Sequence, residues 1–265
     1  MDKPRQAARA ELAATFADPG VADAYQHRPP YPVEVFDILD ELATDRPRAV
    51  LDLGAGQGAL ARPLAARVDR VDAVDISAAM LAEGARLPGG RHPNLHWILG
   101  AAETAELSGG PYALVTAGAS LHWMSWEVTL PRLAQVLARH AFLAIVDHGY
   151  VDQPWRPALT EVIVRHSRSP GYDPSFSVPG ELSARGLWEV AGHATIAPVP
   201  FRQSAASYIE QFHSTSALSR GWMSAAECSA FDRAIERVVA PYATDGFLEM
   251  NVVAELTWGR PVAAA

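Results

Sequence analysis

The sequence contains a single cysteine, no cluster of basic residues and no long apolar run. Cys228 has no partner for an internal disulfide, which fits a reducing compartment, and no Cys/His spacing suggests a metal site. The chain carries 30 acidic and 22 basic residues, so it lacks the basic face typical of nucleic-acid binding. Its longest strongly apolar run, 141–146, is too short to cross a bilayer. We expect a cytoplasmic protein, monomeric or homodimeric, that binds neither nucleic acid nor membranes.

Strand-like and helix-like apolar patterns alternate over the first 147 residues. Short apolar runs predict strands at 49–53, 70–75, 95–99, 112–117 and 142–147. The intervening segments carry the apolar spacing of helices, as at 78–86 and 126–139. This alternation predicts right-handed crossovers and a parallel sheet that helices cover on both faces. The expected fold is α/β, a doubly wound, mostly parallel seven-stranded sheet of Rossmann-like type, which binds ligands at the carboxyl ends of its strands.

The rest of the chain is predicted to add helices and the last strands. Near the N-terminus we expect a helix at 5–16, an irregular, proline-rich segment at 18–32 and a helix at 33–42. Further on we expect a loop at 168–179, helices at 155–167, 181–190, 205–216 and 224–240, and strands at 195–201 and 248–258. Ser224 and Glu227 have the spacing of a capping box. Residues 1–147 would then form a binding core with an N-terminal lid segment, and residues 148–265 lid helices and closing strands of the same sheet.

The strongest local signal is a glycine-rich loop directly after the first predicted strand. Gly54, Gly56 and Gly58 follow one another at every second position, which lets the backbone turn sharply and approach a ligand closely. Taken alone the loop is ambiguous, because Gly54, Gly56 and Ala59 also fit the dinucleotide pattern G-x-G-x-x-A.

Acidic residues around the loop favour a nucleoside ligand that carries a positive charge. Asp52 lies two residues before the first glycine, where its carboxylate can meet a positively charged amino group, whereas a pyrophosphate site would gain nothing from it. Asp75 ends the second predicted strand, where it can accept hydrogen bonds from two ribose hydroxyls. The segment 100–103, Gly-Ala-Ala-Glu, follows the third strand, at the place where an adenine edge would lie.

These motifs resemble those of the class I S-adenosylmethionine-dependent methyltransferases. Asp52-x-Gly-x-Gly-x-Gly58 is similar to their first motif and Asp75-Ile-Ser-x-x-Met80 to their second. The segment 100–103 is similar to their third motif, Gly-Asp-Ala-Glu, with Ala101 at the usual Asp position. The cofactor residues implied, with S-adenosylmethionine as the cofactor, are Tyr25, Arg28, Asp52, Gly54, Ala55, Gly56, Gly58, Asp75, Ile76, Met80, Ala102, Glu103 and Ala117.

Two further segments resemble a small-molecule branch of this family. They are Tyr25-x-x-Arg-Pro-x-Tyr31-Pro and 115–123, Val-Thr-Ala-Gly-Ala-Ser-Leu-His-Trp, and the branch includes trans-aconitate and juvenile hormone acid methyltransferases. The resemblance covers about residues 25–147 and implies a small-molecule methyl acceptor, with oxygen of a carboxylate or hydroxyl favoured. It says little about the remaining chain.

A base is needed for some acceptors only. A carboxylate or phenolate requires none, whereas an alcohol, amine or carbon acceptor would profit from one, and His122 is the candidate. We expect a lid of residues 18–32 and C-terminal helices, whose aromatic residues include Tyr172, to enclose the acceptor. The candidate substrate-binding residues are Tyr31, Trp123, His213 and Trp222.

Other interpretations remain at this point. The enzyme could methylate nitrogen or carbon of a natural-product intermediate. An NAD(P)-dependent oxidoreductase would leave Asp52 and segment 100–103 unexplained, and the intact motifs speak against a non-catalytic binding subunit. Individual residues also have purely structural alternatives, since Asp52 can cap a turn, Met80 can belong to a core and His122 can bond a backbone carbonyl.

Overall fold

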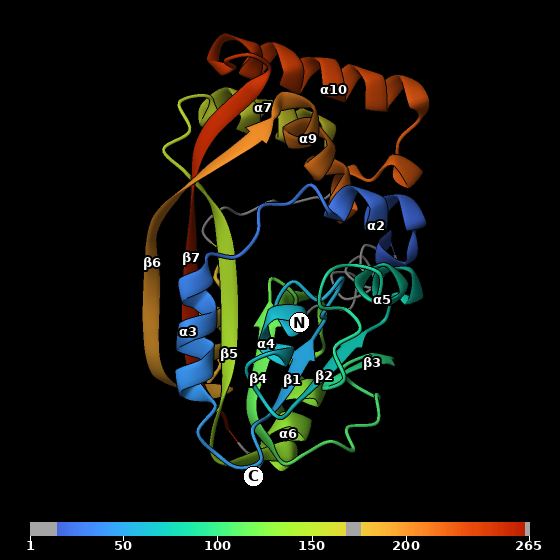
Figure 1. The fold of residues 1–265 in the computed structure, drawn as a ribbon. Helices are drawn as coiled ribbons and strands as arrows, with labels where there is room; N and C mark the ends of the chain where they lie inside the picture. The colour runs from blue at the N-terminus through green and yellow to red at the C-terminus, as the bar shows by residue number, and fades with distance from the viewer. Residues whose placement is uncertain (1–14, 168–175, 263–265) are drawn as a thin grey trace. The chain divides into compact units, whose positions relative to one another are not determined.

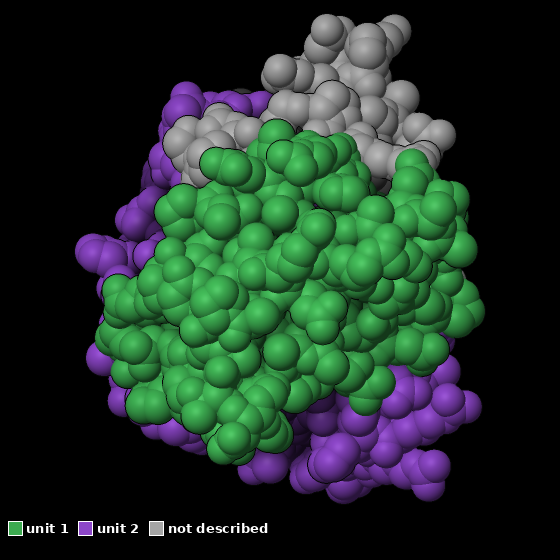
Figure 2. Space-filling view, turned by 90° about the horizontal axis from the view of Figure 1, so that it is seen from above, with its two compact units in different colours: residues 1–30, 149–174, 198–253 green, residues 31–148, 175–197, 254–265 purple. Residues whose placement is uncertain are grey.

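The computed structural model describes residues 15–167 and 176–262, and the chain divides into two compact units (Figure 2). Unit 1 comprises Met1–Pro30, Gly149–Pro174 and Pro198–Val253; unit 2 comprises Tyr31–His148, Ser175–Ala197 and Ala254–Ala265. Most of the helix expected at 5–16, part of the loop expected at 168–179, and Tyr172 lie outside the described residues. One junction between the units falls at residues 148 and 149, and the N-terminal segment groups with the later parts of the chain.

A seven-stranded sheet runs in the order β3-β2-β1-β4-β5-β7-β6 (Figure 1). Its strands are β1 Ala49–Leu53, β2 Arg70–Asp75, β3 Leu95–Leu99, β4 Tyr112–Gly118, β5 Leu137–Val151, β6 Trp188–Ser204 and β7 Phe247–Pro261. The pairs β3-β2, β2-β1, β1-β4 and β4-β5 are all parallel. The predicted α/β fold with a mostly parallel sheet is therefore confirmed, including the closing strands from the end of the chain.

Helices fill the connections between these strands. Those of unit 2 are α3 Val33–Leu42, α4 Ala61–Ala65, α5 Ala78–Gly84, α6 Trp126–Val136, α8 Val178–Ala184 and the 3-10 turn η2 Leu121–Trp123. Those of unit 1 are α2 Pro19–Tyr25, α7 Arg156–His166, α9 Ala205–Glu210, α10 Ala225–Val239 and the 3-10 turns η1 Thr15–Ala17, η3 Gln211–Ser214, η4 Ser216–Leu218, η5 Arg220–Trp222 and η6 Ala240–Tyr242. Among the described helices, none combines the length and apolar character that crossing a bilayer requires.

Each unit has its own apolar core. Every residue of β1 is buried, and β2 and β4 are buried over nearly their whole length, which explains why these strands read as continuous apolar runs. In unit 2, Tyr112 and Trp126 are the largest fully buried side chains. In unit 1 the largest fully buried side chains are Tyr208 and Phe231, which belong to a cluster with residues from α7, α9 and α10.

The expectation of an irregular segment at 18–32 is wrong for its first part, which forms α2. Asp18 caps this helix, since its Oδ1 accepts from the Gly20 N–H at 2.8 Å, and Pro19 takes the first helical position, where a missing N–H costs nothing. The prolines at 29, 30 and 32 dominated the sequence pattern, but they follow the helix.

Two other boundaries differ from the expectation. The helix expected at 181–190 ends at Ala184, because Gly186 takes a left-handed φ of 64° and the chain then enters β6 at Trp188. The helix expected to reach residue 139 stops at Val136, since Leu137 already pairs with Tyr112 as the first residue of β5.

The capping box at the start of α10 is confirmed and predicts a measurable effect on stability. Ser224 Oγ accepts from the Glu227 N–H at 3.2 Å, and Glu227 Oε2 accepts from the Ser224 N–H at 2.7 Å. Ser224→Ala should lower the free energy of unfolding by about 1 kcal/mol in urea denaturation. Ser229→Ala, on the exposed side of the same helix, is the control and should leave it unchanged or slightly higher. Equal effects of the two variants would contradict the role of the cap.

Candidate functional site

The glycine-rich loop leaves the carboxyl end of β1 and turns beside the end of β2. The N–H groups of Gly54 and Ala55 donate to the Val74 carbonyl at 2.8 and 3.0 Å. Gly54, Gly56 and Gly58 have φ values of 66°, 55° and 74°, a left-handed conformation that side chains rarely adopt. The sharp turn expected from the sequence is therefore present.

Gly54 and Gly58 of the loop, and Gly84 of α5, also make room for other side chains of the protein. A Cβ on Gly54 would lie 2.5 Å from Cβ of Ser120, whose Oγ donates to the Leu53 carbonyl at 2.5 Å. A Cβ on Gly58 would lie 2.5 Å from the ring of Trp97, and one on Gly84 would lie 2.6 Å from the same ring. Ser120 and Trp97 thus fix the loop from outside. Sequence reasoning missed both, because no local pattern places β3 or the segment after β4 against this turn.

Asp75 joins the end of β2 to the loop. Its Oδ2 accepts from the Gly56 N–H and its Oδ1 from the Ser77 N–H, both at 2.8 Å. Burial raises the pKa of Asp75 above its ordinary value, while hydrogen bonds from the backbone of Ser77, Gly56 and Ile76 lower it. A carboxylate has about four lone-pair sites, so acceptor capacity remains for a ligand hydroxyl.

Two large apolar side chains are exposed next to Asp75. Ile76, the next residue in the chain, is 47% exposed. Leu99 at the end of β3, which is the register partner of Asp75, is 61% exposed. Both side chains therefore face solvent at the carboxyl ends of neighbouring strands. The carboxyl ends of β2 and β3 therefore offer a carboxylate flanked by apolar surface.

Asp52 lies beneath the loop and is 2% exposed. Its Oδ1 accepts from Thr116 Oγ1 at 2.8 Å. Burial raises the pKa of Asp52 to about 7, with a smaller upward effect from the charge of Asp75, against hydrogen bonds from Thr116 and the Ala61 backbone that lower it. Asp52 thus connects β1 with β4 and α4 from inside, and its contact with an amino group of a ligand stays a prediction.

The third motif is partly occupied by contacts within unit 2. Glu103 Oε1 accepts from the Ser125 N–H at 2.6 Å, ahead of α6. The Ala102 carbonyl accepts from Arg132 Nη1 at 2.9 Å. The contact of Glu103 with an adenine amine stays a prediction.

Three further cofactor residues expected from the sequence, Ala55, Met80 and Ala117, are also buried. Met80 and Ala117 are 1% and 0% exposed, and Ala55 is 9% exposed. Met80 sits in the first turn of α5, where its N–H donates to Ser77 Oγ at 3.2 Å. These three residues are therefore enclosed by protein atoms, and their contacts with a ligand stay a prediction.

The carboxyl ends of β4 and β5 carry the aromatic residues expected near the acceptor. The rings of His122 and Trp123 lie 4.6 Å apart within η2. The ring of Tyr31 lies 4.1 Å from that of His148, and the Tyr31 hydroxyl lies 2.6 Å from where a Cβ on Gly118 would be. These groups belong to unit 2 together with the loop and Asp75.

Four of the expected site residues belong to unit 1. Arg28 lies with its guanidinium 4.2 Å from the centre of the Tyr25 ring and donates to Ser214, to Oγ at 2.7 Å and to the carbonyl at 3.1 Å. Trp222 is half-buried in η5. The Arg28 head group is thus already engaged by its own unit.

His213 is buried in unit 1, with 1% of its surface exposed. Its Nδ1 lies 2.8 Å from the Leu218 carbonyl and its Nε2 lies 2.7 Å from Asp232 Oδ1. Both ring nitrogens are therefore engaged within the protein, and neither is left for a substrate. The sequence could not show this, because Asp232 comes from the distant helix α10.

The raised pKa of Asp52 predicts a pH dependence of stability. Since the folded protein holds the proton more tightly than the unfolded chain, the stabilisation is complete below pH 4 and is lost as the pH rises through about 7. It amounts to about 1.4 kcal/mol per unit of pKa shift. Urea denaturation between about pH 4 and 7 should show that the free energy of unfolding falls as the pH rises. Asp52→Asn should remove the part of this fall that Asp52 causes. Glu41→Gln, an exposed change on α3, should leave the slope intact; an unchanged slope in Asp52→Asn would contradict the assignment.

Comparison with known proteins gives a consistent result. Residues 50–140 match the family described as "Methyltransferase domain". An uncharacterized methyltransferase of Mycobacterium tuberculosis is 34% identical over 112 residues, which cover 41% of this chain and 55% of that protein. A provisionally named methyltransferase of Dictyostelium discoideum is 25% identical over 130 residues, 49% of this chain and 48% of that protein. The chain thus spans about half the length of the curated relatives it matches.

Solved structures share the fold over a longer stretch. A provisionally named type II methyltransferase from Anaeromyxobacter dehalogenans has a TM-score of 0.64 and 21% identity, and the match covers 89% of this chain and 99% of that one. An S-adenosylmethionine-dependent methyltransferase from Geobacter sulfurreducens, solved with S-adenosyl-L-homocysteine, has a TM-score of 0.52 and 15% identity, with 98% and 99% covered. Residues 50–140 are therefore similar to a methyltransferase domain, and the chain shares the fold of these solved structures.

Proposed function

We propose that the protein is an S-adenosylmethionine-dependent methyltransferase that acts on a small molecule, at the oxygen of a carboxylate or hydroxyl. The observation that carries this proposal is the group formed by Asp75, Ile76 and Leu99 beside the glycine-rich loop. It offers acceptor capacity at a carboxylate and apolar surface on two neighbouring strand ends. These are the contacts that a ribose and an adenine ring require.

The adenosine part of the cofactor is assigned to the ends of β2 and β3. Asp75 would accept hydrogen bonds from the ribose hydroxyls, because the backbone N–H groups that donate to it leave part of its acceptor capacity free. Ile76 and Leu99 would cover the faces of the adenine ring, and Glu103 would accept from its amine. Of the side chains in this assignment, Ile76 and Leu99 are exposed, whereas Met80 and Ala117 are buried.

The amino-acid part of the cofactor would then follow the loop toward β4. Gly54 and Gly56 present backbone without side chains along this path, and Asp52 holds β1 and β4 together beneath it. The reacting end would lie near the carboxyl end of β4, where Tyr31, His122 and Trp123 are found. Tyr25 and Arg28 remain proposed cofactor contacts, and His213 and Trp222 proposed lid residues, all from unit 1.

Bound S-adenosylmethionine supplies a methyl group on a positively charged sulfur, which is already an activated leaving group. The protein therefore has to align the acceptor and exclude water. Tyr31 and Trp123 would supply apolar walls with polar tips for this purpose. His122 would hold or remove a proton at an acceptor hydroxyl, whereas a carboxylate acceptor would need only positioning.

The oxygen acceptor is the finer part of the proposal. It is supported by the resemblance of segments 25–32 and 115–123 to the branch with trans-aconitate and juvenile hormone acid methyltransferases. The net charge of −8 supports a small molecule rather than nucleic acid as the acceptor. Methylation of nitrogen or carbon at the same place would leave the cofactor site unchanged.

Calorimetric titration with S-adenosyl-L-homocysteine, and separately with NAD, tests the cofactor. We expect saturable one-to-one binding of the first and none of the second. Binding of NAD alone would instead make the loop a dinucleotide site, which the G-x-G-x-x-A pattern of residues 54–59 would also permit.

Asp75→Asn should weaken binding of S-adenosyl-L-homocysteine by at least about tenfold, because it removes charge-assisted hydrogen bonds of about 1.5–3 kcal/mol each. The same calorimetric titration measures this effect. Glu106→Gln, which removes an exposed carboxylate from the loop before β4, is the matched control and should bind normally. If Asp75→Asn is folded and binds as tightly as the parent protein, Asp75 does not contact the ribose.

His122→Ala should lower turnover by about 10²-fold, with cofactor affinity unchanged, if the acceptor is a hydroxyl. Turnover is measured as transfer of labelled methyl to acceptors found in a screen of small carboxylates and hydroxylated compounds. If the acceptor is a carboxylate, His122→Ala should weaken binding of the acceptor and leave the turnover rate nearly unchanged. Parallel losses of cofactor affinity and turnover would place His122 on the cofactor and contradict its role as base.

A further inference from the structure

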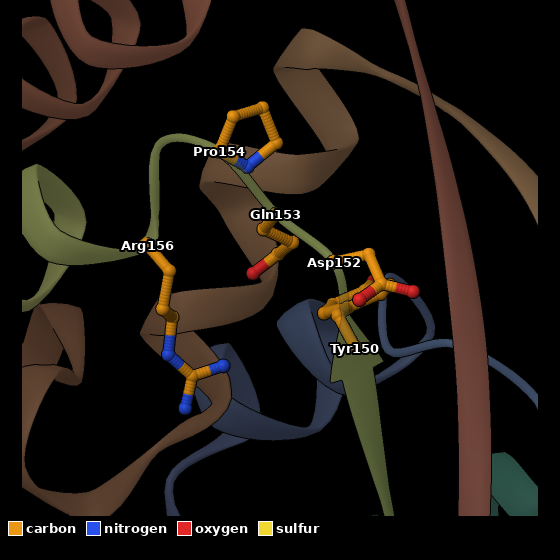
Figure 3. A pocket seen from close by; sticks show the side chains of 5 residues that line it. All are labelled: Tyr150, Asp152, Gln153, Pro154 and Arg156. Atoms are coloured by element: carbon orange, nitrogen blue, oxygen red, sulfur yellow. The ribbon is translucent and has the colours of Figure 1, made fainter.

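Unit 1 contains a pocket of about 520 Å³ that the proposed cofactor site does not use (Figure 3). It lies where β5 ends and α7 begins, and its lining residues are Tyr150, Asp152, Gln153, Pro154 and Arg156. All five belong to one continuous segment of unit 1. The volume is within the usual range for small-molecule sites.

The pocket carries one charge of each sign. Asp152 and Arg156 are both exposed, and neither forms an ion pair with any other residue that the structure describes. Asp152 has a φ of 56°, a left-handed conformation that is uncommon for a residue with a side chain. Such conformations cluster at ligand sites. The charges are therefore available to a ligand with a cationic and an anionic group.

The amide of Gln153 adds a buried acceptor. Gln153 is 8% exposed, and its Nε2 donates to Tyr208 Oη at 3.0 Å and lies 3.5 Å from Met250 Sδ. The thioether can only accept, which places the nitrogen and not the oxygen on that side. Oε1 is left without a donor among the described residues. Figure 3 shows this oxygen directed between the side chains of Arg156 and Tyr150.

An unpaired buried acceptor is unfavourable, and native proteins have few of them. A ligand that donates a hydrogen bond would remove this deficit. An amino group does so and at the same time matches the nearby carboxylate of Asp152.

Tyr150 gives the pocket a fixed apolar wall. Its hydroxyl lies 3.0 Å from Gln203 Oε1 and 3.1 Å from Gln211 Oε1, and its ring centre lies 5.7 Å from that of Tyr208. Burial raises the pKa of Tyr150 above its ordinary value, so the wall stays uncharged. Pro154 supplies further apolar surface.

We propose that this pocket binds a small amino carboxylate with an apolar body. The carboxylate would pair with Arg156, the amino group with Asp152 and Gln153 Oε1, and the apolar body would lie against Tyr150 and Pro154. A guanidinium suits a carboxylate because it can donate two parallel hydrogen bonds. The site lies wholly within unit 1, and the proposal does not depend on methyl transfer.

The test uses L-phenylalanine as the probe, with 3-phenylpropionate and 2-phenylethylamine as analogues that lack the amine or the carboxylate. Ligand-observed NMR titration of the full chain measures the three dissociation constants without any cofactor. We expect saturable binding of phenylalanine and at least about tenfold weaker binding of each analogue. Absence of saturable phenylalanine binding, or equal binding of all three probes, would overturn the proposal.

Variants locate the binding to this pocket. Arg156→Gln and Asp152→Asn should each weaken phenylalanine binding by about tenfold, and asparagine tolerates the left-handed backbone at position 152. Gln153→Met, which keeps the volume but removes the acceptor, should weaken it as well. Arg165→Gln, near the other end of α7, is the matched control and should bind normally. Uniform affinity across all folded variants would place the probe elsewhere and reject the site.

Discussion

The hydrogen bonds that Asp75 accepts from Gly56 and Ser77 are the constraint on which the candidate cofactor site depends. They fasten the glycine-rich loop to the end of β2 and hold the exposed Ile76 beside it. Asp52 links β1, the strand before this loop, to β4 through Thr116. The two buried carboxyl groups repel each other, and the charge of Asp75 contributes to the raised pKa of Asp52. A positively charged ligand would relieve this repulsion, whereas a pyrophosphate would increase it, and this distinguishes the two cofactors that the glycine pattern allows.

The second support of the loop comes from packing. Ser120 lies against Gly54 and Trp97 lies against Gly58, so the motif glycines serve the protein's own interior as well as any ligand. A sequence motif of this kind is therefore weaker evidence for a ligand than its regular spacing suggests. The side chains of Ile76 and Leu99 at the ends of β2 and β3, by contrast, are largely open to solvent.

The sheet and the loop could be predicted because their signals are local. Buried parallel strands read as apolar runs, and a left-handed turn requires glycine at particular positions. What the sequence could not show depends on partners distant along the chain. His213 faces Asp232 of α10, the Arg28 head group faces Ser214, and the orphaned acceptor of Gln153 exists only because Tyr208 and Met250 occupy its amide nitrogen. Helix α2 could not be predicted for a different reason: the prolines that follow it indicate an irregular segment, although Asp18 has the residue type of a helix cap.

The indole of Trp97 has a consequence for how this sequence can change over time. It fills the space above both Gly58 and Gly84, and its Nε1 donates to the Gly90 carbonyl at 2.9 Å. The three positions 58, 84 and 97 therefore share one volume. Loss of the indole would not by itself free either position, because Gly58 keeps a left-handed φ of 74° and a Cβ on Gly84 would still lie 2.9 Å from the Gln57 carbonyl oxygen. Among diverging descendants of this chain, both glycines should therefore persist even where the large ring at position 97 is lost.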